Sequence, residues 1–219
     1  MKSVQISVII PVHNSEKYIG RCLRSLLKQT KNENEYELIL INDDSTDNTE
    51  SAINPFLGDI RYFKNDKKLG LPGSLNKGIK QAKGQYIVRV DSDDYVHWDY
   101  LNILSMHLNL NNNMDAIACD YLLVDDHQNV LSHENCLDKP IGCGIMFKLD
   151  KLIDIGLYDE EFLAREDEEL SLRFTKKYKI ERVALPLYRY RKHERNLTNN
   201  KKQMDKFSKK LIEKKFNND

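Results

Sequence analysis

Continuous apolar runs alternate with amphipathic segments along the first part of the chain. The runs at 6–10 (ISVII), 36–41 (YELILI) and 87–90 (IVRV) are rich in β-branched residues, which is typical of strands buried on both faces of a parallel sheet. Apolar positions recur at helical spacing over 18–27, and the segment 70–84 is expected to form a loop and a helix that ends at a glycine. Strands that alternate with helices predict a doubly wound, mostly parallel α/β sheet with right-handed crossovers.

The rest of the chain continues this pattern less regularly. Asn14 or Ser15 is expected to cap the first helix, and Thr46 or Asp47 a short helix that reaches Phe56. No internal repeat or low-complexity linker marks a second domain. The further elements expected are strands at 60–63, 115–124 and 180–193, helices at 98–111 and 166–178, a loop-rich crossing at 129–144, and a strand followed by a helix at 145–156.

The C-terminal part of the chain carries most of the positive charge. The chain has 34 Lys or Arg and 34 Asp or Glu, but residues 176–219 carry a net charge of +10 and residues 1–175 a net charge of −10. The last twenty residues place Met204, Phe207, Leu211 and Phe216 among lysines, the pattern of a basic amphipathic helix. This tail, 197–219, is expected either to be a solvated helix or to contact a phosphate-rich partner or an anionic membrane.

Composition indicates a globular protein, with 40% hydrophobic and 31% charged residues. No apolar run approaches the roughly 20 residues that span a bilayer, and the first residues lack a signal-peptide cleavage pattern, so we expect a cytoplasmic protein. The four cysteines have no paired C-x-x-C spacing, which argues against a disulfide framework or a zinc site.

Polar residues follow three of the expected strands at their carboxyl ends, in the stretches PVHN, NDDSTD and DSDD. Ligands bind at this edge of an open parallel sheet. Asp91, Asp93 and Asp94 come directly after a buried strand, where their mutual repulsion needs neutralisation. An Asp-x-Asp offers oxygen ligands to a divalent cation such as Mg²⁺ or Mn²⁺, which would make a diphosphate a better leaving group. The alternative is that these aspartates cap a helix without a metal.

Three common nucleotide or hydrolase motifs are absent. The segment 70–78 lacks the G-K-[ST] of a P-loop, and no G-x-G-x-x-G follows the first strand, which argues against a dinucleotide cofactor. No G-x-S-x-G elbow is present either, which argues against an α/β-hydrolase.

Four stretches carry a resemblance to a known family: SVIIPVHNSEKYIGRCLRSLLKQT, ELILINDDSTDNT, NKGIKQAKGQYIVRVDSDD and REDEELSLR. In this order they resemble the successive motifs of family 2 glycosyltransferases, inverting enzymes of the GT-A fold. The resemblance runs from about Ser7 to about His193. It implies a GT-A-like, mostly parallel central sheet within one domain, 1–196, whose Rossmann-like nucleotide-binding half covers about 1–95 and whose smaller acceptor half covers about 96–196, followed by the C-terminal helix.

The resemblance also implies a donor pocket and a metal site. Residues expected to contact a nucleotide-diphosphate sugar, expected to be a UDP-sugar, are Pro11, His13, Asn14, Asp43, Lys68, Asn76, Asp91 and Ser92. Asp43 would accept a hydrogen bond from the base. A divalent cation, Mn²⁺ or Mg²⁺, would be held by Asp93, Asp91 and His193, with Asp93 as the first choice of direct ligand. Asp44 stands where the family usually has glycine or asparagine, and Leu75 where it often has arginine.

On the acceptor side, Asp167 matches the family's catalytic base, and Gly142, Cys143, Gly144 and Glu166 would lie beside the acceptor. An acceptor hydroxyl attacks well when a carboxylate takes its proton, and attack opposite the diphosphate inverts the anomeric centre. The resemblance therefore implies transfer of a sugar to a hydroxyl of a glycan or a lipid-linked acceptor, with no nucleic acid involved.

Two alternatives stay open. One is a sugar-nucleotide-binding module without catalysis, in which the base-binding and metal motifs persist. The other is a nucleotidyltransferase, for which a glycine- and lysine-rich loop would be expected where PVHNSEKY stands.

Overall fold

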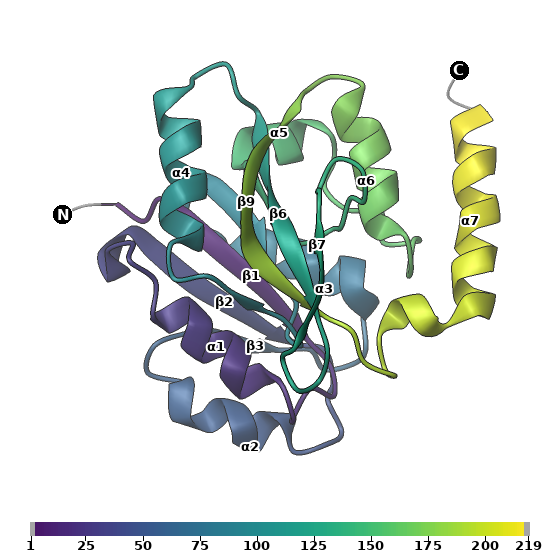
Figure 1. Cartoon of the computed structure of the whole chain (residues 1–219). Coiled ribbons are helices and arrows are strands. Elements are labelled where there is room, and N and C mark those ends of the chain that lie inside the picture. The colour runs from purple at the N-terminus through teal and green to yellow at the C-terminus, as the bar shows by residue number, and fades with distance from the viewer. Residues whose placement is uncertain (1–2, 217–219) are drawn as a thin grey trace.

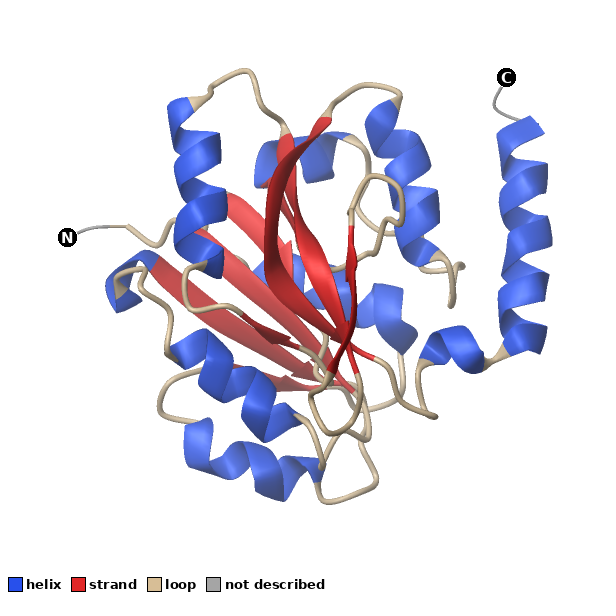
Figure 2. Cartoon of the chain, viewed as in Figure 1, coloured by secondary structure: helices blue, strands red, loops and turns tan. Residues whose placement is uncertain are grey.

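The computed structural model describes residues 3–216 and has a nine-stranded central sheet between layers of helices (Figures 1 and 2). The sheet order is β3-β2-β1-β4-β8-β6-β9-β5, and β7 also pairs with β6. The strands are β1 (Ile6–Val12), β2 (Tyr36–Asn42), β3 (Arg61–Lys64), β4 (Tyr86–Arg89), β5 (Tyr95–Val96), β6 (Ala116–Val124), β7 (Val130–Glu134), β8 (Ile145–Lys148) and β9 (Ile180–Arg191). The α-helices are α1 (Ile19–Leu27), α2 (Thr49–Ile53), α3 (Gly70–Gln81), α4 (Tyr100–Leu110), α5 (Leu149–Asp154), α6 (Glu166–Thr175) and α7 (Lys201–Phe216), with short 3-10 turns at Glu33–Glu35, Asn54–Phe56 and Leu197–Asn199.

The apolar runs of the first strands are continuous because both faces of the sheet are covered. Side chains alternate between the two faces along a strand. In β1, Val8 and Ile10 pack in the cluster that includes α1 and α4, whereas Ile9 packs in the cluster that includes α3, α5 and α6. Strands β3, β2, β1 and β4 are parallel to one another, as the sequence predicts for this half.

The second half of the sheet is mixed. β8 runs antiparallel to both β4 and β6, and β7 and β5 add antiparallel pairings, while β6 and β9 are parallel. One edge of β6 pairs with β9 along its whole length, and its other edge is shared by β8, at Ala116–Ala118, and β7, at Tyr121–Val124. The expected loop-rich crossing at 129–144 therefore contains a strand. The predicted mixed α/β class is confirmed, with a parallel half formed by β3, β2, β1 and β4 and a second half of mixed strand direction.

The predicted helix caps are wrong in one case. Asn14 has a φ of 52° and Ser15 directs its hydroxyl towards Ser92, so neither side chain caps α1. Backbone N–H groups at the start of α1 bond instead to the Ser15 carbonyl. Asp47 does accept a hydrogen bond from the N–H of Thr49, at the start of α2.

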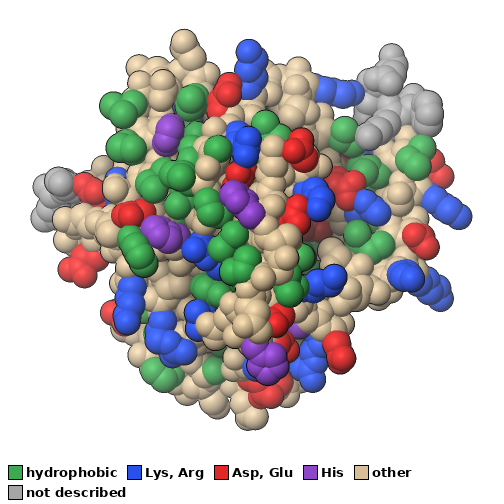
Figure 3. Space-filling model, in the orientation of Figure 1, with side chains coloured by type: hydrophobic (Ala, Val, Ile, Leu, Met, Phe, Trp, Pro, Cys, Tyr) green, Lys and Arg blue, Asp and Glu red, His purple; other side chains and the backbone are tan. Residues whose placement is uncertain are grey.

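The apolar face of α7 is occupied within the chain. Phe207 and Leu211 are buried, and they pack in one cluster with Phe162 and Ala164 of the loop before α6. Lys210 pairs with Glu161, and further lysine pairs follow along the helix. On the face in Figure 3, Lys and Arg side chains along the α7 edge are mixed with Asp and Glu side chains. Membrane contact through this face would require α7 to leave its present position.

The structure describes most of the predicted C-terminal tail. The side chain of Phe216 and residues 217–219 lie outside the described part of the chain. None of the helices described between residues 3 and 216 combines the length and the apolar character of a membrane-spanning segment.

Candidate functional site at the carboxyl edge of the sheet

The loops that follow β1, β2 and β4 meet at one edge of the sheet, as the sequence predicts. Nδ1 of His13, after β1, lies 2.7 Å from the carbonyl oxygen of Asp43, after β2. The hydroxyl oxygens of Ser15 and Ser92 are 2.8 Å apart, which joins the first loop to the loop after β4. Asn14 uses its Oδ1 to accept a backbone hydrogen bond from the second loop. Segments far apart in sequence thus form one continuous polar surface.

Asp43 organises the start of α3. Its carboxylate accepts hydrogen bonds from the side chain of Asn65 (2.8 Å) and from the N–H groups of Leu69 (2.7 Å) and Gly70 (2.9 Å). Oδ2 receives only the Gly70 bond among these, so it retains capacity for a further donor. Next to it, Asp44 has a φ of 58°, which explains why a glycine suits this position; aspartate is among the residues that tolerate this conformation.

Lys68 lies on the rim of the same surface. A carbonyl oxygen only accepts, so His13 donates from Nδ1 to Asp43, which leaves its Nε2 as the acceptor for the Lys68 ammonium at 2.9 Å. Lys68 is exposed, and Pro11 is buried within β1. Lys68 therefore extends over the rim of this polar surface, whereas Pro11 is enclosed in the strand that leads to it.

The side chain of Asn76 makes different contacts from those predicted. It is buried, its Nδ2 donates to the carbonyl of Tyr158 and to Glu160 (both 2.9 Å), and its Oδ1 accepts from the N–H of Tyr158 (3.0 Å). Its amide is fully engaged in tying α3 to the loop before α6. The structure therefore gives Asn76 the role of positioning this loop rather than contacting a donor sugar directly.

The acidic loop after β4, residues 91–94, is held by a network of hydrogen bonds. Arg89 donates to both carboxylate oxygens of Asp91, at 2.6 Å and 3.0 Å. The buried Asp94 accepts from the Tyr188 hydroxyl (2.8 Å) and from the backbone N–H of Arg191 (2.7 Å). Burial raises the pKa of the Asp91 and Asp94 carboxyls, and the neighbouring Asp93 adds to both shifts. The repulsion expected from the sequence is real, and Arg89 offsets it at Asp91.

The side chain of Asp93 lies outside this network and contacts His193. Its Oδ2 lies 2.8 Å from Nε2 of His193, whose ring stacks on Tyr18 at 4.7 Å between centroids. An octahedral cation with bonds of about 2.1 Å separates neighbouring ligand atoms by about 3 Å. The two atoms share a hydrogen bond, and their 2.8 Å separation is also close to that of neighbouring octahedral ligands. The carboxylate oxygen suits Mn²⁺ or Mg²⁺, whereas an imidazole nitrogen favours Mn²⁺ over Mg²⁺.

A second group of ligand-type atoms lies deeper. One atom each of Asp91, Asp94 and Cys143 falls within 4.8 Å of the others. Asp94 is already engaged by Tyr188, and burial raises the pKa of the Cys143 thiol well above its usual range, so the sulfur is a protonated, poor ligand. Asp93 is the more accessible carboxylate, with a side chain that is 25% exposed, and it lies against the nearly buried His193; this pair is the better fit to a cation.

Arg89 links the two parts of the site, and the sequence interpretation missed it. Its NH1 donates to Oε1 of Glu166 at 2.8 Å, while its other nitrogens hold Asp91. Ile87, two residues earlier, faces the layer that contains α6, so alternation along the strand directs Arg89 to the same side. An arginine inside a buried apolar strand is itself a signal, because a buried charge needs a partner. Burial raises the pKa of Glu166 to about 7.

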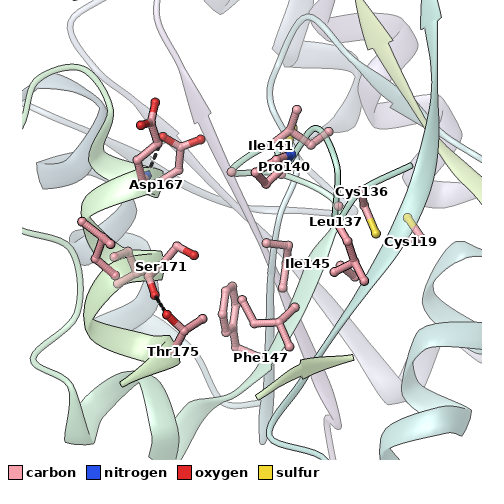
Figure 4. Close-up of a pocket in the computed structure, with 18 of the residues that line it drawn as sticks. Cys119, Cys136, Leu137, Pro140, Ile141, Ile145, Phe147, Asp167, Ser171 and Thr175 are labelled. Atoms are coloured by element: carbon pink, nitrogen blue, oxygen red, sulfur yellow. Dashed lines mark hydrogen bonds between the residues drawn. The ribbon is translucent and has the colours of Figure 1, made fainter. Parts of the chain in front are cut away.

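Asp167 lies in the first turn of α6 and is half-buried. Its Oδ1 accepts a hydrogen bond from the N–H of Glu168 at 2.9 Å, and it lines one end of a cavity of about 350 Å³ (Figure 4). Gly142 is packed against it: a Cβ on Gly142 would come within 2.5 Å of the Asp167 Cβ and 2.9 Å of Arg89 NH1. Cys143 and Gly144 line the same cavity. The predicted acceptor-side residues thus lie together.

Two arginines near the end of β9 differ in environment. Arg191 is buried, donates from Nε to the Asp93 carbonyl (2.8 Å) and lies over the rings of Tyr18 and Tyr95. It therefore fixes the acidic loop. Arg195 is exposed.

Sequence comparison supports a family assignment. The profile described as Glycosyl transferase family 2 matches residues 7–139, more than half of the chain. A poly(ribitol-phosphate) beta-glucosyltransferase of Bacillus spizizenii is 41% identical over 97 residues, which cover 42% of this chain and 15% of that protein. An uncharacterized glycosyltransferase of Rickettsia typhi is 30% identical over 217 residues, covering 89% and 66%. The chain spans less than half the length of the first curated relatives that it matches.

Structural comparison confirms the predicted GT-A-like fold. TarS 1–349 of Staphylococcus aureus in complex with UDP-GlcNAc superposes with a TM-score of 0.77 at 23% identity, over 90% of this chain and 61% of that one. A mannosyltransferase from Pyrobaculum calidifontis in complex with GDP-Man and Mn²⁺ gives a TM-score of 0.71 at 16% identity, over 90% and 59%. At these identities the likeness concerns the fold.

Proposed function

The chain belongs to glycosyl transferase family 2, and we propose that it is an inverting glycosyltransferase that moves a sugar from a nucleotide-diphosphate sugar to an acceptor hydroxyl. The observation that carries this proposal is the Arg89 bridge, which holds Asp91 beside Glu166 and thereby sets the acidic loop next to Asp167. A donor bound over the acidic loop would place its anomeric carbon near the carboxylate that accepts the proton. A module that only binds nucleotide has no need for this second carboxylate.

The donor site in this proposal uses the surface formed by the loops after β1, β2 and β4. Asp43 accepts a hydrogen bond from the base through Oδ2, which is the oxygen with spare capacity. His13, Asn14 and Ser92 line the nucleotide pocket with Pro11 beneath them, and Lys68 approaches the phosphates from the rim. A UDP-sugar is the proposed donor, in line with the UDP-GlcNAc named for the TarS structure.

Asp93 and His193 would hold a divalent cation, with Asp91 on its inner side. When bound, the cation neutralises the diphosphate and improves it as a leaving group. The protein's own contribution is to keep these ligands in place: Arg191 fixes the Asp93 backbone and Tyr18 stacks on the imidazole. Arg191 also adds positive charge beside this loop.

On the opposite side, Asp167 takes the proton of the attacking hydroxyl as the new glycosidic bond forms. Because its side chain lies at an open cavity, an acceptor can reach it from solvent. Glu166 is turned inward to Arg89, so its proposed role is to position Asp167 and the acidic loop. Gly142 leaves room for Asp167, and Cys143 and Gly144 continue the same wall.

In this division of labour, residues 1–95 form the donor half and 96–196 the acceptor half of one domain, and 197–219 form a C-terminal tail. We propose a glycan or lipid-linked acceptor; poly(ribitol-phosphate), which appears in the names of two relatives, is a polymer of this general kind. The tail is not part of the proposed catalytic site.

The test is a donor screen with Mn²⁺ that follows release of nucleotide diphosphate across common sugar nucleotides. UDP release from one UDP-sugar, lost on treatment with a chelator, is the expected result. Asp167→Asn, which keeps the shape of the side chain, should abolish transfer while nucleotide binding by calorimetry is retained. No release with any sugar nucleotide despite tight UDP binding would leave a binding module, and release of sugar 1-phosphate in place of nucleoside diphosphate would indicate nucleotidyl transfer.

A further inference from the structure

The cavity that begins at Asp167 has two unlike walls. One is the side of α6 where Asp167, Ser171 and Thr175 follow one another along the helix. The facing wall is formed by Leu137, Pro140, Ile141 and Ile145, as Figure 4 shows. Leu137 and Pro140 are exposed, so this wall opens to solvent at its outer end. The volume of about 350 Å³ falls within the range of small-molecule sites, about 300–1,000 Å³.

Away from Asp167, the lining is mostly apolar, and its polar side chains are Glu168 and the hydroxyl groups of Tyr158, Ser171 and Thr175. Among the residues that line the cavity, the only charged side chains are Asp167 and Glu168, and no Lys, Arg, His, Asn or Gln is present. Hydroxyl groups placed against the apolar wall would lose their water without gaining a partner, which costs about 1–3 kcal/mol for each group. The cysteines in the lining, Cys119, Cys136 and Cys143, are weak hydrogen-bond donors.

We propose that the acceptor carries a hydrocarbon group close to its accepting hydroxyl, and that this group binds the cavity between α6 and the wall formed by 137–145. This inference rests on the proposed glycosyltransferase function and specifies its acceptor class: an alkyl or prenyl chain with a polar head, rather than an internal unit of a polysaccharide. The hydroxyl would sit at Asp167, and the hydrocarbon would extend past Ser171 towards Thr175.

Continuity with Asp167 favours a ligand over another protein surface as the occupant. A hydroxyl brought to this carboxylate has the cavity directly behind it, because Gly142 closes the near side against Asp167. Leu211 of α7 and Phe147 of β8 also line the cavity, so the C-terminal helix contributes to its apolar surface. A second copy of the chain, or a further segment of a longer protein, could also cover an apolar wall, and the experiment separates these cases.

The experiment compares n-octyl and methyl β-D-glucopyranoside, used below the micelle concentration, with the full chain saturated by UDP and Mn²⁺. Binding is followed by chemical shifts of ¹³C-labelled isoleucine methyl groups at Ile141 and Ile145. Each buried CH₂ contributes about 0.8 kcal/mol, a factor of about four. We expect octyl glucoside to bind at least about tenfold more tightly than methyl glucoside, with shifts at both methyl groups.

Two variants locate the effect. Ser171→Phe fills the cavity from α6 and should remove the octyl preference, whereas Ser171→Ala should keep it. Leu137→Asp, at a position that is 56% exposed, adds a charge at the mouth and should weaken octyl binding without a large effect on folding. UDP affinity, measured by calorimetry, should stay unchanged in all three variants.

Equal binding of the two glucosides, or an octyl preference that both Ser171→Phe and Leu137→Asp leave intact, would overturn the proposal. Concentration-dependent self-association that Ser171→Phe abolishes would overturn it too, in favour of a second copy. UDP binding is measured separately, so a failure of the proposed function shows as absent nucleotide binding and a failure of this inference as absent chain-length dependence.

Discussion

Replacement of Arg89 by methionine tests whether the bridge between the two halves of the site has the importance that the structure gives it. The side chain is 8% exposed and donates three hydrogen bonds, two to Asp91 and one to Glu166. Methionine keeps much of the apolar stem but leaves two largely buried carboxylates without their cation. Breaking a buried ion pair by removal of one partner costs about 3–5 kcal/mol, and we expect Arg89→Met to lower the free energy of unfolding by this amount at pH 7.

A double-mutant cycle with Glu166→Gln separates the bridge from general packing. Glu166→Gln removes the charge that Arg89 neutralises, so Arg89→Met should be less destabilising in that background, with a coupling energy of about 1–3 kcal/mol. The assay is urea unfolding at pH 7, followed by circular dichroism. Arg61→Met is the matched control, because Arg61 also pairs with a glutamate, Glu37 at 2.6 Å, but is 31% exposed and should cost about 1 kcal/mol or less.

The same variant makes a prediction about activity. Without Arg89, Asp91 and Glu166 lose their common partner, so kcat should fall at least about tenfold while UDP affinity changes less, since Asp43 and His13 lie outside the bridge. An unfolding free energy within 1 kcal/mol of the parent, together with strictly additive effects in the cycle, would refute the reasoning.

Three further predictions concern other contacts. Gly142→Ala would bring a Cβ within 2.5 Å of the Asp167 Cβ, so transfer should fall at least about tenfold with an unchanged far-UV spectrum; unchanged kcat would contradict this close packing. The hydrogen bond from Arg182 is the main cause that lowers the pKa of Asp120 to about 2. This pair should therefore stabilise the fold above about pH 4 and lose its contribution as the pH falls towards 2. Arg182→Met should flatten the plot of unfolding free energy against pH in this range. Phe207→Ala should release α7, seen as faster proteolysis within 201–216 and little change in unfolding of the sheet, whereas equal protease resistance would argue against the docking.

The pKa of Glu166 makes a related statement about pH. Burial raises it from an ordinary 4.5 to about 7, so the folded state retains a proton that the unfolded chain has lost. The resulting contribution to stability is complete below about pH 4.5 and disappears as the pH rises through about 7. Glu166→Gln should therefore remove this decline between pH 4.5 and 7, which unfolding curves at several pH values can check.

Local pattern was sufficient for the strands of the parallel half and for the edge where they end, but not for β5 and β7. Apolar runs such as 6–10 and 36–41 can be buried on both faces only in a covered sheet, and the polar residues that follow them must then gather at its carboxyl edge. Asp93 and His193 were expected to lie together because both occur in recognisable motifs. In the structure, Oδ2 of Asp93 lies 2.8 Å from Nε2 of His193. The strands and their edge depend on residues near in sequence and on the general rules of parallel sheets, whereas Asp93 and His193, 100 residues apart, were expected together because of the family resemblance.

Tertiary structure alone decided the contacts between distant segments. Arg89 and Glu166 are 77 residues apart, and no local pattern states that an arginine in β4 will meet the first turn of α6. The amide of Asn76 was assigned to the donor because of its motif, yet the loop at Tyr158 takes all of its hydrogen bonds. The spacing of apolar residues correctly predicted helix α7. The residue against which its apolar face packs, Phe162, lies in a loop that has no periodic pattern. Periodicity determines which face of an element is apolar; which surface covers that face, and which charges meet across it, depends on how the elements are arranged in three dimensions.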